Sequence, residues 1–268
     1  MSYKVKDKKE LKSIIKRCDA IGDFTEVENL DISALDDLAC VFCCCNNLKY
    51  INLNKWDVSN VENMGGMFAK CEYLERIEIN EWDVSKVKNM MEMFKECINL
   101  KGIDISKWKT TNLNDISYMF SFCYKLKQID LSTFDISKVN NFDCIFKACR
   151  EIEKIDISNW DISNVKYMNE LFHYCENLKD MRISRLKSSK RINISHLFYD
   201  CCYKIEYFDL SNCDIVKIDG VRDMFYCCGS RLKKVNILNW DIMNSNYSYN
   251  MFKHCDKLNI MDVLLFTL

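Results

Sequence analysis

Hydrophobic and polar positions follow a pattern that returns every 26 residues along most of the chain. The stretch Trp56-Asp57-Val58-Ser59 recurs at residues 82–85, and related forms begin at residues 30, 108, 134 and 160. Three further copies begin at Leu186, Cys213 and Trp240, after steps of 26, 27 and 27 residues. Self-similarity at such a period is the signature of a stacked repeat protein. The pattern therefore predicts nine units that cover residues 30 to about 264.

Phenylalanine and cysteine occupy fixed positions in these units. A phenylalanine stands 12 residues after the start of each unit, and a cysteine follows it three residues later, as in Phe68 and Cys71. Repetition at constant phase indicates side chains that stack on their equivalents in the neighbouring units. We expect this structural role for Trp56, Trp82, Trp108, Trp160, Trp240, Phe68, Phe94, Phe120, Cys71, Cys97, Cys123, Cys149 and Cys175.

Each unit contains two patterns of secondary structure. The motif L-x-x-I-x-I, as in Leu74-Ile77-Ile79, alternates and is β-branched, which predicts a short strand. The segment with Val61, Met64, Met67 and Phe68 has a helical stripe of apolar residues. One strand and one short helix per unit predict an α/β fold, a right-handed leucine-rich-repeat solenoid. Short parallel strands would then form the concave face and short helices the convex face.

The two ends differ from the repeats. Residues 8–20 place Leu11, Ile14, Ile15 and Cys18 on one helical face, which predicts an amphipathic capping helix. We expect a cap and lead-in over residues 1–29, a solenoid over 30–263 and an apolar tail over 264–268. The tail either folds back over the last strand or leaves an open edge for a partner.

Composition and charge exclude several classes of function. The 268 residues carry 38 Lys and Arg against 39 Asp and Glu, a formal net charge of −1, so bulk charge does not favour nucleic-acid binding. There is no proline, and the six glycines form no phosphate-binding loop motif. The charged start of the chain has no apolar core of a secretion signal, which predicts a cytoplasmic protein with reduced thiols.

The unit W-D-V-S-N-V-x-x-M-x-x-M-F-x-x-C-x-x-L-x-x-I-x-I resembles the BspA-like leucine-rich repeat, and the match is best over residues 56–181. This resemblance implies a solenoid that recognises proteins, often in adhesion, and it implies no catalysis. Secreted members have a signal peptide and an anchor, and we expect neither in this chain. A surface adhesin therefore stays an alternative, with the cell surface as the alternative location.

A column of acidic residues is expected on the concave face, between the two inward-facing residues of each strand. Two interpretations remain open for it: a consensus aspartate that bonds to the adjacent turn or is offset by lysines, or an acidic stripe that binds a basic partner. The column consists of Glu78, Asp104, Asp130, Asp156, Asp209 and Asp262.

The seventh unit diverges most from the pattern and carries a local excess of positive charge. Neutral drift and a binding site for an acidic protein surface both explain such divergence. The predicted basic patch consists of Lys179, Arg182, Arg185, Lys187, Lys190 and Arg191.

The remaining candidates for chemistry are cysteines and histidines. Cys40-x-x-Cys43 resembles half of a zinc site, but no second pair of ligands follows it, so we expect no metal and no cofactor. We expect His173, His196 and His254 to be packing or surface residues. A thiol-rich redox or metal-binding protein nevertheless stays an alternative.

We therefore predict a non-enzymatic scaffold that binds a protein partner through its concave face and its basic seventh repeat. Nucleic-acid and membrane partners are not expected. The chain is expected to be a monomer, or a dimer that forms through the C-terminal edge.

Overall fold

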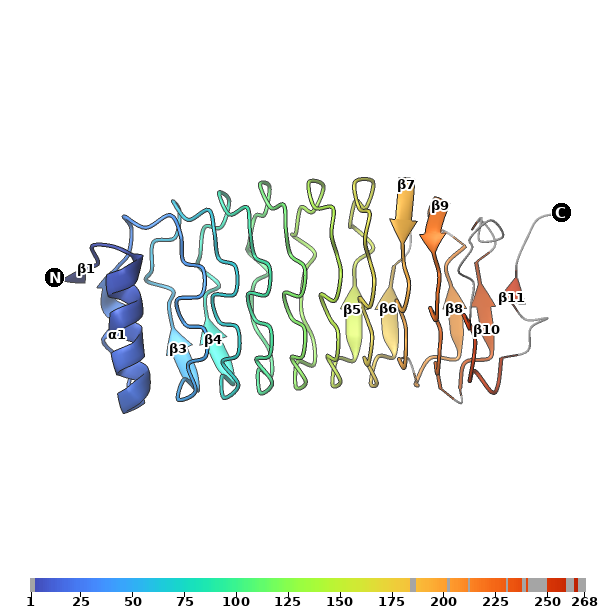
Figure 1. Ribbon diagram of the computed structural model, residues 1–268, viewed down its shortest axis with the longest axis horizontal. Coiled ribbons are helices and arrows are strands. Elements are labelled where there is room, and N and C mark those ends of the chain that lie inside the picture. Colours follow the sequence, from blue (N-terminus) through green and yellow to red (C-terminus); the bar gives the residue numbers. More distant parts are fainter. Residues whose placement is uncertain are drawn as a thin grey trace.

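Each repeat unit forms one coil of a solenoid, and the coils follow one another along the long axis of the molecule (Figure 1). The computed structural model describes residues 3–183, 187–201, 203–211, 213–229, 231–237, 240, 250–258 and 263–264. The described part of the chain contains no helix with the length and hydrophobicity that a membrane crossing requires. Parallel pairing of strands from successive coils confirms the predicted solenoid class.

The expected helix closes the N-terminal end of the array. Helix α1 spans Lys8–Ile21. Asp7 caps its start by accepting a hydrogen bond from the amide of Glu10, and Gly22 ends it in the left-handed conformation. The predicted apolar face is buried against the first coil. Beside the helix, β1 (Tyr3–Lys4) pairs in parallel with β2 (Leu30–Asp31), after the short 3-10 helix η1 (Val27–Asn29).

Short parallel strands lie along one side of the solenoid, which we call the strand face. They are β3 (Tyr50–Asn52), β4 (Arg76–Glu78), β5 (Lys154–Asp156), β6 (Asp180–Arg182), β8 (Tyr207–Asp209), β10 (Lys234–Asn236) and β11 (Val263–Leu264). Where strands of adjacent coils pair, they pair in register, so that Ile51 stands beside Ile77 and Ile155 beside Met181, whereas the described strands β6 and β8 do not pair with each other.

The strand ladder is interrupted in the middle of the array. Residues 102–105 and 128–131 follow the strand pattern in sequence, yet they form no strand in the fully described range 3–183. Backbone bonds at the start of these segments, such as Lys127 N to Lys101 O at 3.4 Å, still connect neighbouring coils. The strand face is therefore paired at both ends of this range and open between them.

The opposite side of each coil differs from the prediction. The segments with the apolar stripe, residues 38–45 and their equivalents in later coils, consist of turns, so the expected short helices are wrong. Two residues per segment have positive φ, as in Gly66 at 60° and Lys70 at 61°, and such residues end a right-handed helix. We call these segments the turn segments and their outer surface the turn face.

Backbone hydrogen bonds of the turn segments run between coils. The amides of Met64, Gly66, Phe68 and Lys70 donate to carbonyl oxygens of the next coil at distances of 2.7–2.9 Å. Amides between them close local turns, as in Met67 N to Met64 O. Equivalent bonds join every successive pair of coils in the described residues, which makes the turn side the more continuous connection.

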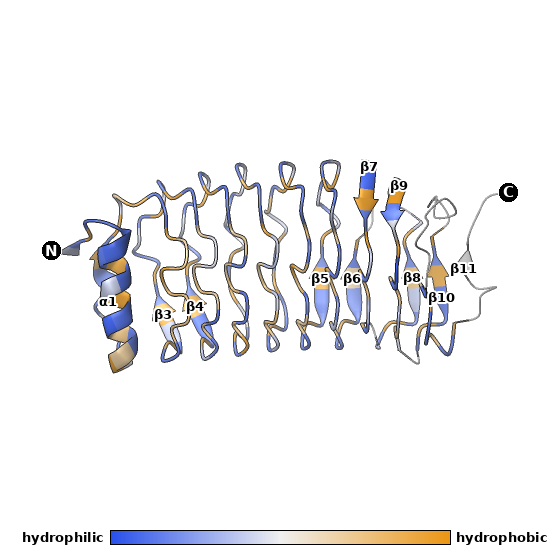
Figure 2. Cartoon of the chain, viewed as in Figure 1, coloured by the Kyte–Doolittle hydropathy of each residue, from blue (hydrophilic) through white to orange (hydrophobic). Residues whose placement is uncertain are grey.

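The core consists of columns of equivalent side chains. Hydrophobic positions recur along the successive coils (Figure 2). The rings of Phe68, Phe94 and Phe120 are nearly parallel, with centroids 5.5 Å apart at both steps. The indole rings of Trp82 and Trp108 stack in the same way at 6.2 Å. All thirteen residues predicted to have structural roles are buried in the core, as expected from their constant phase.

The divergent seventh unit contains an extra pair of strands. β7 (Lys187–Asn193) and β9 (Asp214–Gly220) pair in parallel, with an irregular register between Ser188 and Arg191. They lie at the edge away from β6 and β8 (Figure 1), where other units have the Trp-Asp-Val-Ser turn. Loss of that turn motif therefore coincides with a longer extended segment.

Candidate functional site

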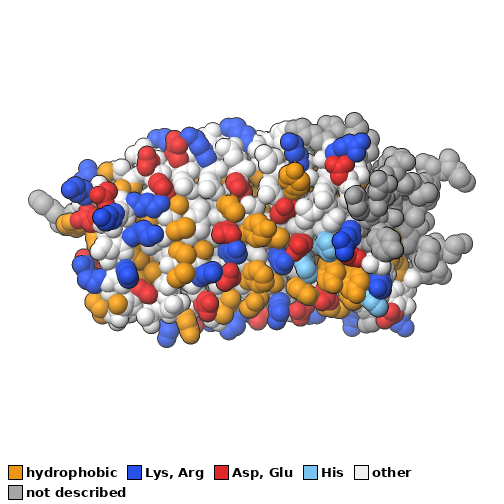
Figure 3. All heavy atoms as spheres, in the orientation of Figure 1, with side chains coloured by type: hydrophobic (Ala, Val, Ile, Leu, Met, Phe, Trp, Pro, Cys, Tyr) orange, Lys and Arg blue, Asp and Glu red, His pale blue; other side chains and the backbone are white. Residues whose placement is uncertain are grey.

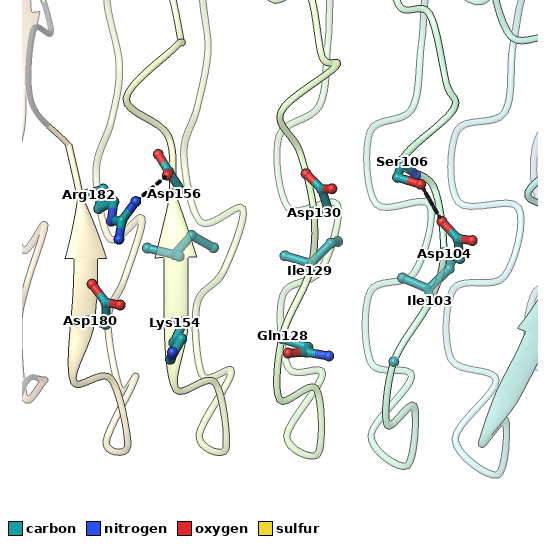
Figure 4. A pocket seen from close by; sticks show the side chains of 12 residues that line it. Ile103, Asp104, Ser106, Gln128, Ile129, Asp130, Lys154, Asp156, Asp180 and Arg182 are labelled. Carbon is teal, nitrogen blue, oxygen red and sulfur yellow. Dashed lines mark hydrogen bonds and ion pairs between the residues drawn. The ribbon is translucent and has the colours of Figure 1, made fainter.

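A groove lies on the strand face where the ladder is open. Its volume is about 580 Å³, and its lining comes from three successive coils and β6 (Figure 4). A second hollow of about 670 Å³ adjoins it on the N-terminal side and shares Gly102, Ile103 and Asp104. Both hollows include segments that lack strand pairing, residues 102–105 in both and 128–131 in the groove, and they extend from there onto the paired strands β4, β5 and β6.

Isoleucine side chains form the apolar floor of this groove. Ile103 and Ile129 are only partly buried, whereas their equivalents Ile77 and Ile155 are 4% and 3% exposed. Gly102 adds no side chain above the floor, and nothing lies within 4 Å of the position of a Cβ there. Apolar side-chain surface is therefore exposed in the groove, whereas the equivalent surface is buried where the strands pair.

Asp104, Asp130 and Asp156 form a row along one wall (Figure 4), which we call the acidic row. In each, Oδ1 accepts a hydrogen bond of 2.9–3.1 Å from the backbone amide two residues later. Hydrogen bonds from Ser106 and Ser158 lower the pKa of Asp104 and Asp156. The carboxylates therefore order the turns and carry negative charge into the groove.

Within residues 3–183, ion pairing of the acidic row is confined to its Asp156 end, although Lys107 also lies near Asp104 and adds to the lowering of its pKa. Arg182 approaches Asp156 at 3.7 Å, and Lys154 lines the opposite wall together with Asp180. Within residues 3–183, no lysine or arginine forms an ion pair with Asp104 or Asp130. Lys101, a lysine close to Asp104 in sequence, pairs with Glu75 instead. The central part of the row is therefore uncompensated by direct ion pairs.

Other members of the predicted acidic column lie outside this groove. Glu78 pairs with Arg76 at 2.6 Å and accepts a hydrogen bond from Asn52. Asp209 has the same turn bonds to Ser211, but it borders a separate hollow of about 310 Å³ between β6 and β8. Asp262 lies outside the described residues.

The predicted basic patch is divided in the structure. Lys179 and Arg182 belong to the strand side and pair with Glu153 and Asp156, whereas Arg191 belongs to β7 and pairs with Asp219. β6 and β7 lie at opposite edges of the coil (Figure 1). Arg185 lies outside the described residues, and Lys187 and Lys190 are placed by the backbone of β7 alone. The described members therefore do not form one surface.

The cysteine column consists of buried free thiols. Cys97 and Cys123 donate to the carbonyl oxygens of Phe68 and Phe94 at 3.2 and 3.1 Å, and the same bond recurs in other coils. Burial raises the pKa of both thiols well above the usual range, which keeps them protonated. In the described part of the chain, no three His, Cys, Asp or Glu residues are arranged to hold a metal ion.

A cluster of histidines and tyrosines on the turn face was missed by the sequence prediction. The ring of Tyr199 contacts both His173 and His196, with centroids 4.6 and 5.6 Å apart. His173 also lies 3.0 Å from Glu170, and His196 lies 3.3 Å from the buried Asp223. Figure 3 shows the histidines beside hydrophobic side chains on this face. The signal in the sequence was that His173 and Tyr199 share one phase of the repeat, while Glu170, His196 and Asp223 share another.

Several solved structures show weak similarity to the chain. A TLR13 chain in a complex with ssRNA13 has 12% identity and a TM-score of 0.25, over 95% of this chain and 48% of the other. This chain thus spans about half the length of that neighbour. A leucine-rich-repeat protein of Leptospira interrogans has 10% identity and a TM-score of 0.24, over 84% and 75% of the two chains. The functional domain of InlJ from Listeria monocytogenes has 13% identity and a TM-score of 0.22, over 88% and 64%.

A comparison with curated proteins gives no significant match. By contrast, one protein family matches most of the chain. The family described as "Mycoplasma protein of unknown function, DUF285" matches four overlapping segments, residues 9–128, 76–155, 94–207 and 145–263. Together these segments span the capping helix and the repeat array. The chain therefore belongs to this family of repeat proteins.

Proposed function

We propose that the protein is a non-enzymatic scaffold that binds a basic segment of a protein partner in the groove of the strand face. The observation that carries this proposal is the acidic row, which stands beside the partly exposed Ile103 and Ile129 in a groove that begins where strand pairing is absent and ends at the paired strands β5 and β6. Carboxylates along an apolar floor complement a segment that alternates cationic and apolar side chains. The basic patch is not used, because its described members are paired with acidic residues.

The spacing of the coils defines the partner further. In the core of the coils that carry the acidic row, the rings of Phe94, Phe120 and Phe146 are 5.5 and 5.9 Å apart. An α-helix rises about 5.4 Å per turn, so one cationic side chain per turn matches one carboxylate per coil. An extended strand repeats on one face at about 6.6 Å. A helix with a basic stripe therefore fits the acidic row better than an extended segment does.

A binding experiment with designed peptides tests this proposal. The probe is a fluorescent peptide with lysines once per helical turn beside leucines, and binding is followed by anisotropy at low and high salt. Changing Asp104, Asp130 and Asp156 to Asn keeps the oxygen that orders each turn while it removes the charge. We expect this variant to weaken binding about tenfold, because exposed ion pairs contribute about 0.2–1 kcal/mol each.

The matched control changes Asp57, Asp83 and Asp161 to Asn. These residues accept the same type of turn hydrogen bond, from Ser59, Ser85 and Ser163, at another edge of the coil. The control is expected to bind like the unmodified protein. Equal weakening in both variants, or none in the acidic-row variant, would contradict the proposal. A peptide of the same composition with lysines at every second position tests the helical spacing.

A further inference from the structure

Among the cysteines that the structure describes, the exposed thiols lie in the first coil. Of the sixteen cysteines in the described residues, only Cys40 and Cys44 are exposed, and Cys43 and Cys227 are half-buried. The other twelve are buried, and most of the column donates hydrogen bonds to backbone carbonyl oxygens, as Cys71 does to Phe42 at 3.1 Å. Among the described cysteines, those that a reagent in solution can reach most easily therefore lie at residues 40–44.

Two of these thiols are in contact with each other. The Sγ atoms of Cys43 and Cys44 are 3.5 Å apart. Cys40 is directed to the next coil instead, with its Sγ 3.6 Å from the carbonyl oxygen of Gly65. Cys43 and Cys44 are thus an adjacent pair of free thiols at the surface, with no barrier of protein atoms between the sulfurs.

We propose that Cys43 and Cys44 form a reversible dithiol–disulfide site that reacts with small-molecule disulfides of the glutathione type. The Cys44 thiol loses its proton, and the thiolate attacks one sulfur of the reagent. The S–S bond of the reagent breaks, and one thiolate leaves and takes up a proton. The Cys43 thiol then deprotonates and attacks Cys44 Sγ, which releases the second reagent thiol. Two protein thiols are oxidised, and one disulfide is reduced to two thiols.

The different surroundings of the two sulfurs assign their roles. Cys44 is exposed and meets the reagent first, whereas Cys43 is less accessible. Burial and the neighbouring Cys44 raise the pKa of Cys43 to about 12. A thiol that stays protonated is a poor first nucleophile, because the thiolate is the reactive form. Cys43 is therefore the resolving residue, which acts when the mixed disulfide has been formed beside it.

Closure of this disulfide changes the backbone of the first coil. The Cα atoms of adjacent residues are about 3.8 Å apart, which is shorter than the ~4.4–6.8 Å of ordinary disulfides. Because this distance is fixed by the peptide between the two cysteines, the small ring that closes can form only if the dihedral angles on either side of the peptide change. The N–H group of this peptide belongs to Cys44 and donates to Ala69 O in the second coil at 2.9 Å. We expect oxidation to open this hydrogen bond and the product to be easily reduced, since strained and exposed disulfides are labile.

A second adjacent pair supplies an internal control. Cys227 is half-buried, but Cys228 is fully buried and its Sγ donates to the carbonyl oxygen of Phe198 at 2.9 Å. Burial raises the pKa of Cys228 well above its usual value. Adjacency in sequence alone would let Cys227 and Cys228 close, whereas the structure predicts that they stay reduced.

The experiment exposes the native full chain to oxidised glutathione, blocks the remaining thiols with a maleimide after unfolding, and identifies peptides by mass spectrometry. We expect the peptide with Cys43 and Cys44 to be unlabelled at both residues and two hydrogens lighter, and to regain its thiols with dithiothreitol. Cys43→Ser is expected to stop at a glutathione adduct on Cys44, and Cys40→Ser to react like the unmodified chain. Hydrogen exchange of the Cys44 amide is expected to rise on oxidation.

Full labelling of Cys44 after oxidation, a disulfide that includes Cys40, or equal closure of Cys227 and Cys228 would each overturn the proposal. Circular dichroism of every variant checks that the fold is retained. The glutathione adduct on Cys44 of the Cys43→Ser variant tests separately whether Cys44 is the first nucleophile. This test does not depend on how fast the disulfide with Cys43 closes. This site is remote from the acidic row, so its outcome is independent of the binding experiment.

Discussion

The indole Nε1 of Trp82 donates a 2.8 Å hydrogen bond to the carbonyl oxygen of Leu53, 29 residues earlier in the preceding coil. Trp56 and Trp108 form the equivalent bonds to Val27 and Ile79. The buried Nε1 of Trp160 has no hydrogen-bond partner among the described residues. Tryptophans at the same repeat position thus differ in one hydrogen bond.

This difference predicts unequal effects of the same substitution. Trp82→Phe removes one of the two hydrogen bonds that the carbonyl oxygen of Leu53 accepts, the other coming from the amide of Trp56, whereas Trp160→Phe removes a donor that was already unpaired. We expect Trp82→Phe to destabilise the fold by about 1 kcal/mol more than Trp160→Phe. Urea unfolding of both variants measures this difference in the free energy of unfolding. Equal midpoints would show that the indole hydrogen bond does not stabilise the coil.

The phenylalanine column predicts a second contrast. Phe120 is fully buried between Phe94 and Phe146, while Phe122, two residues later, is half-buried on the turn face. Phe120→Ala should cost about 3–5 kcal/mol because it leaves a cavity in a stacked column. Phe122→Ala should cost much less, and thermal unfolding compares the two. A larger effect at Phe122 would contradict the core described above.

Left-handed backbone at the turn segments leads to a third prediction. Lys70 is exposed and has a φ of 61°. Asparagine tolerates this conformation, whereas a β-branched residue does not. We expect Lys70→Val to be less stable than Lys70→Asn by about 1–2 kcal/mol. The matched change Lys49→Val, with Lys49→Asn beside it, is made at a residue of ordinary φ and should show no such preference for asparagine.

The carboxyl group of Glu170 supplies a prediction about pH. Hydrogen bonds from His173 and Lys147 lower the pKa of Glu170 to about 2 from 4.5. Because the pKa in the folded state is lowered, this contact stabilises the fold above pH 4.5, and the contribution is lost as the pH falls towards 2. Carboxyl carbon NMR should show the low titration point, and His173→Ala should raise it. His254→Ala, at a histidine that does not contact Glu170, is the control.

The repeat period made most of the architecture predictable. Residues that recur at one phase, such as Phe94 and Cys97, have the same neighbours in each coil, so the sequence alone identified the buried columns and the capping helix. The turn segments were misassigned for a physical reason. Successive three-residue turns, closed by bonds such as Met67 N to Met64 O, direct apolar side chains inward at nearly helical intervals. The left-handed positions hold residues as different as Glu92 and Tyr118, so composition did not reveal them.

The candidate site was predictable only in part. The sequence placed Asp104, Asp130 and Asp156 on one face, but the hydrogen bonds of their turns and the opening of the ladder depend on how neighbouring coils are packed. Residues that are near in sequence can also be separated, because Lys179 directly precedes β6 and Arg191 belongs to β7, and these strands lie at opposite edges of the coil (Figure 1). His173 and His196 come together for the converse reason, since stacking joins residues separated by nearly one repeat.

The two sides of the solenoid differ in mechanical stiffness. Hydrogen bonds of the turn segments join all successive coils in the described residues, whereas residues 102–105 and 128–131 have no strand pairing. Bending that spreads the turn face must break backbone hydrogen bonds, but bending that spreads the strand face near Asp130 breaks few. Curvature is therefore the soft degree of freedom of this molecule, and the width of the groove can adjust to a ligand without any coil unfolding.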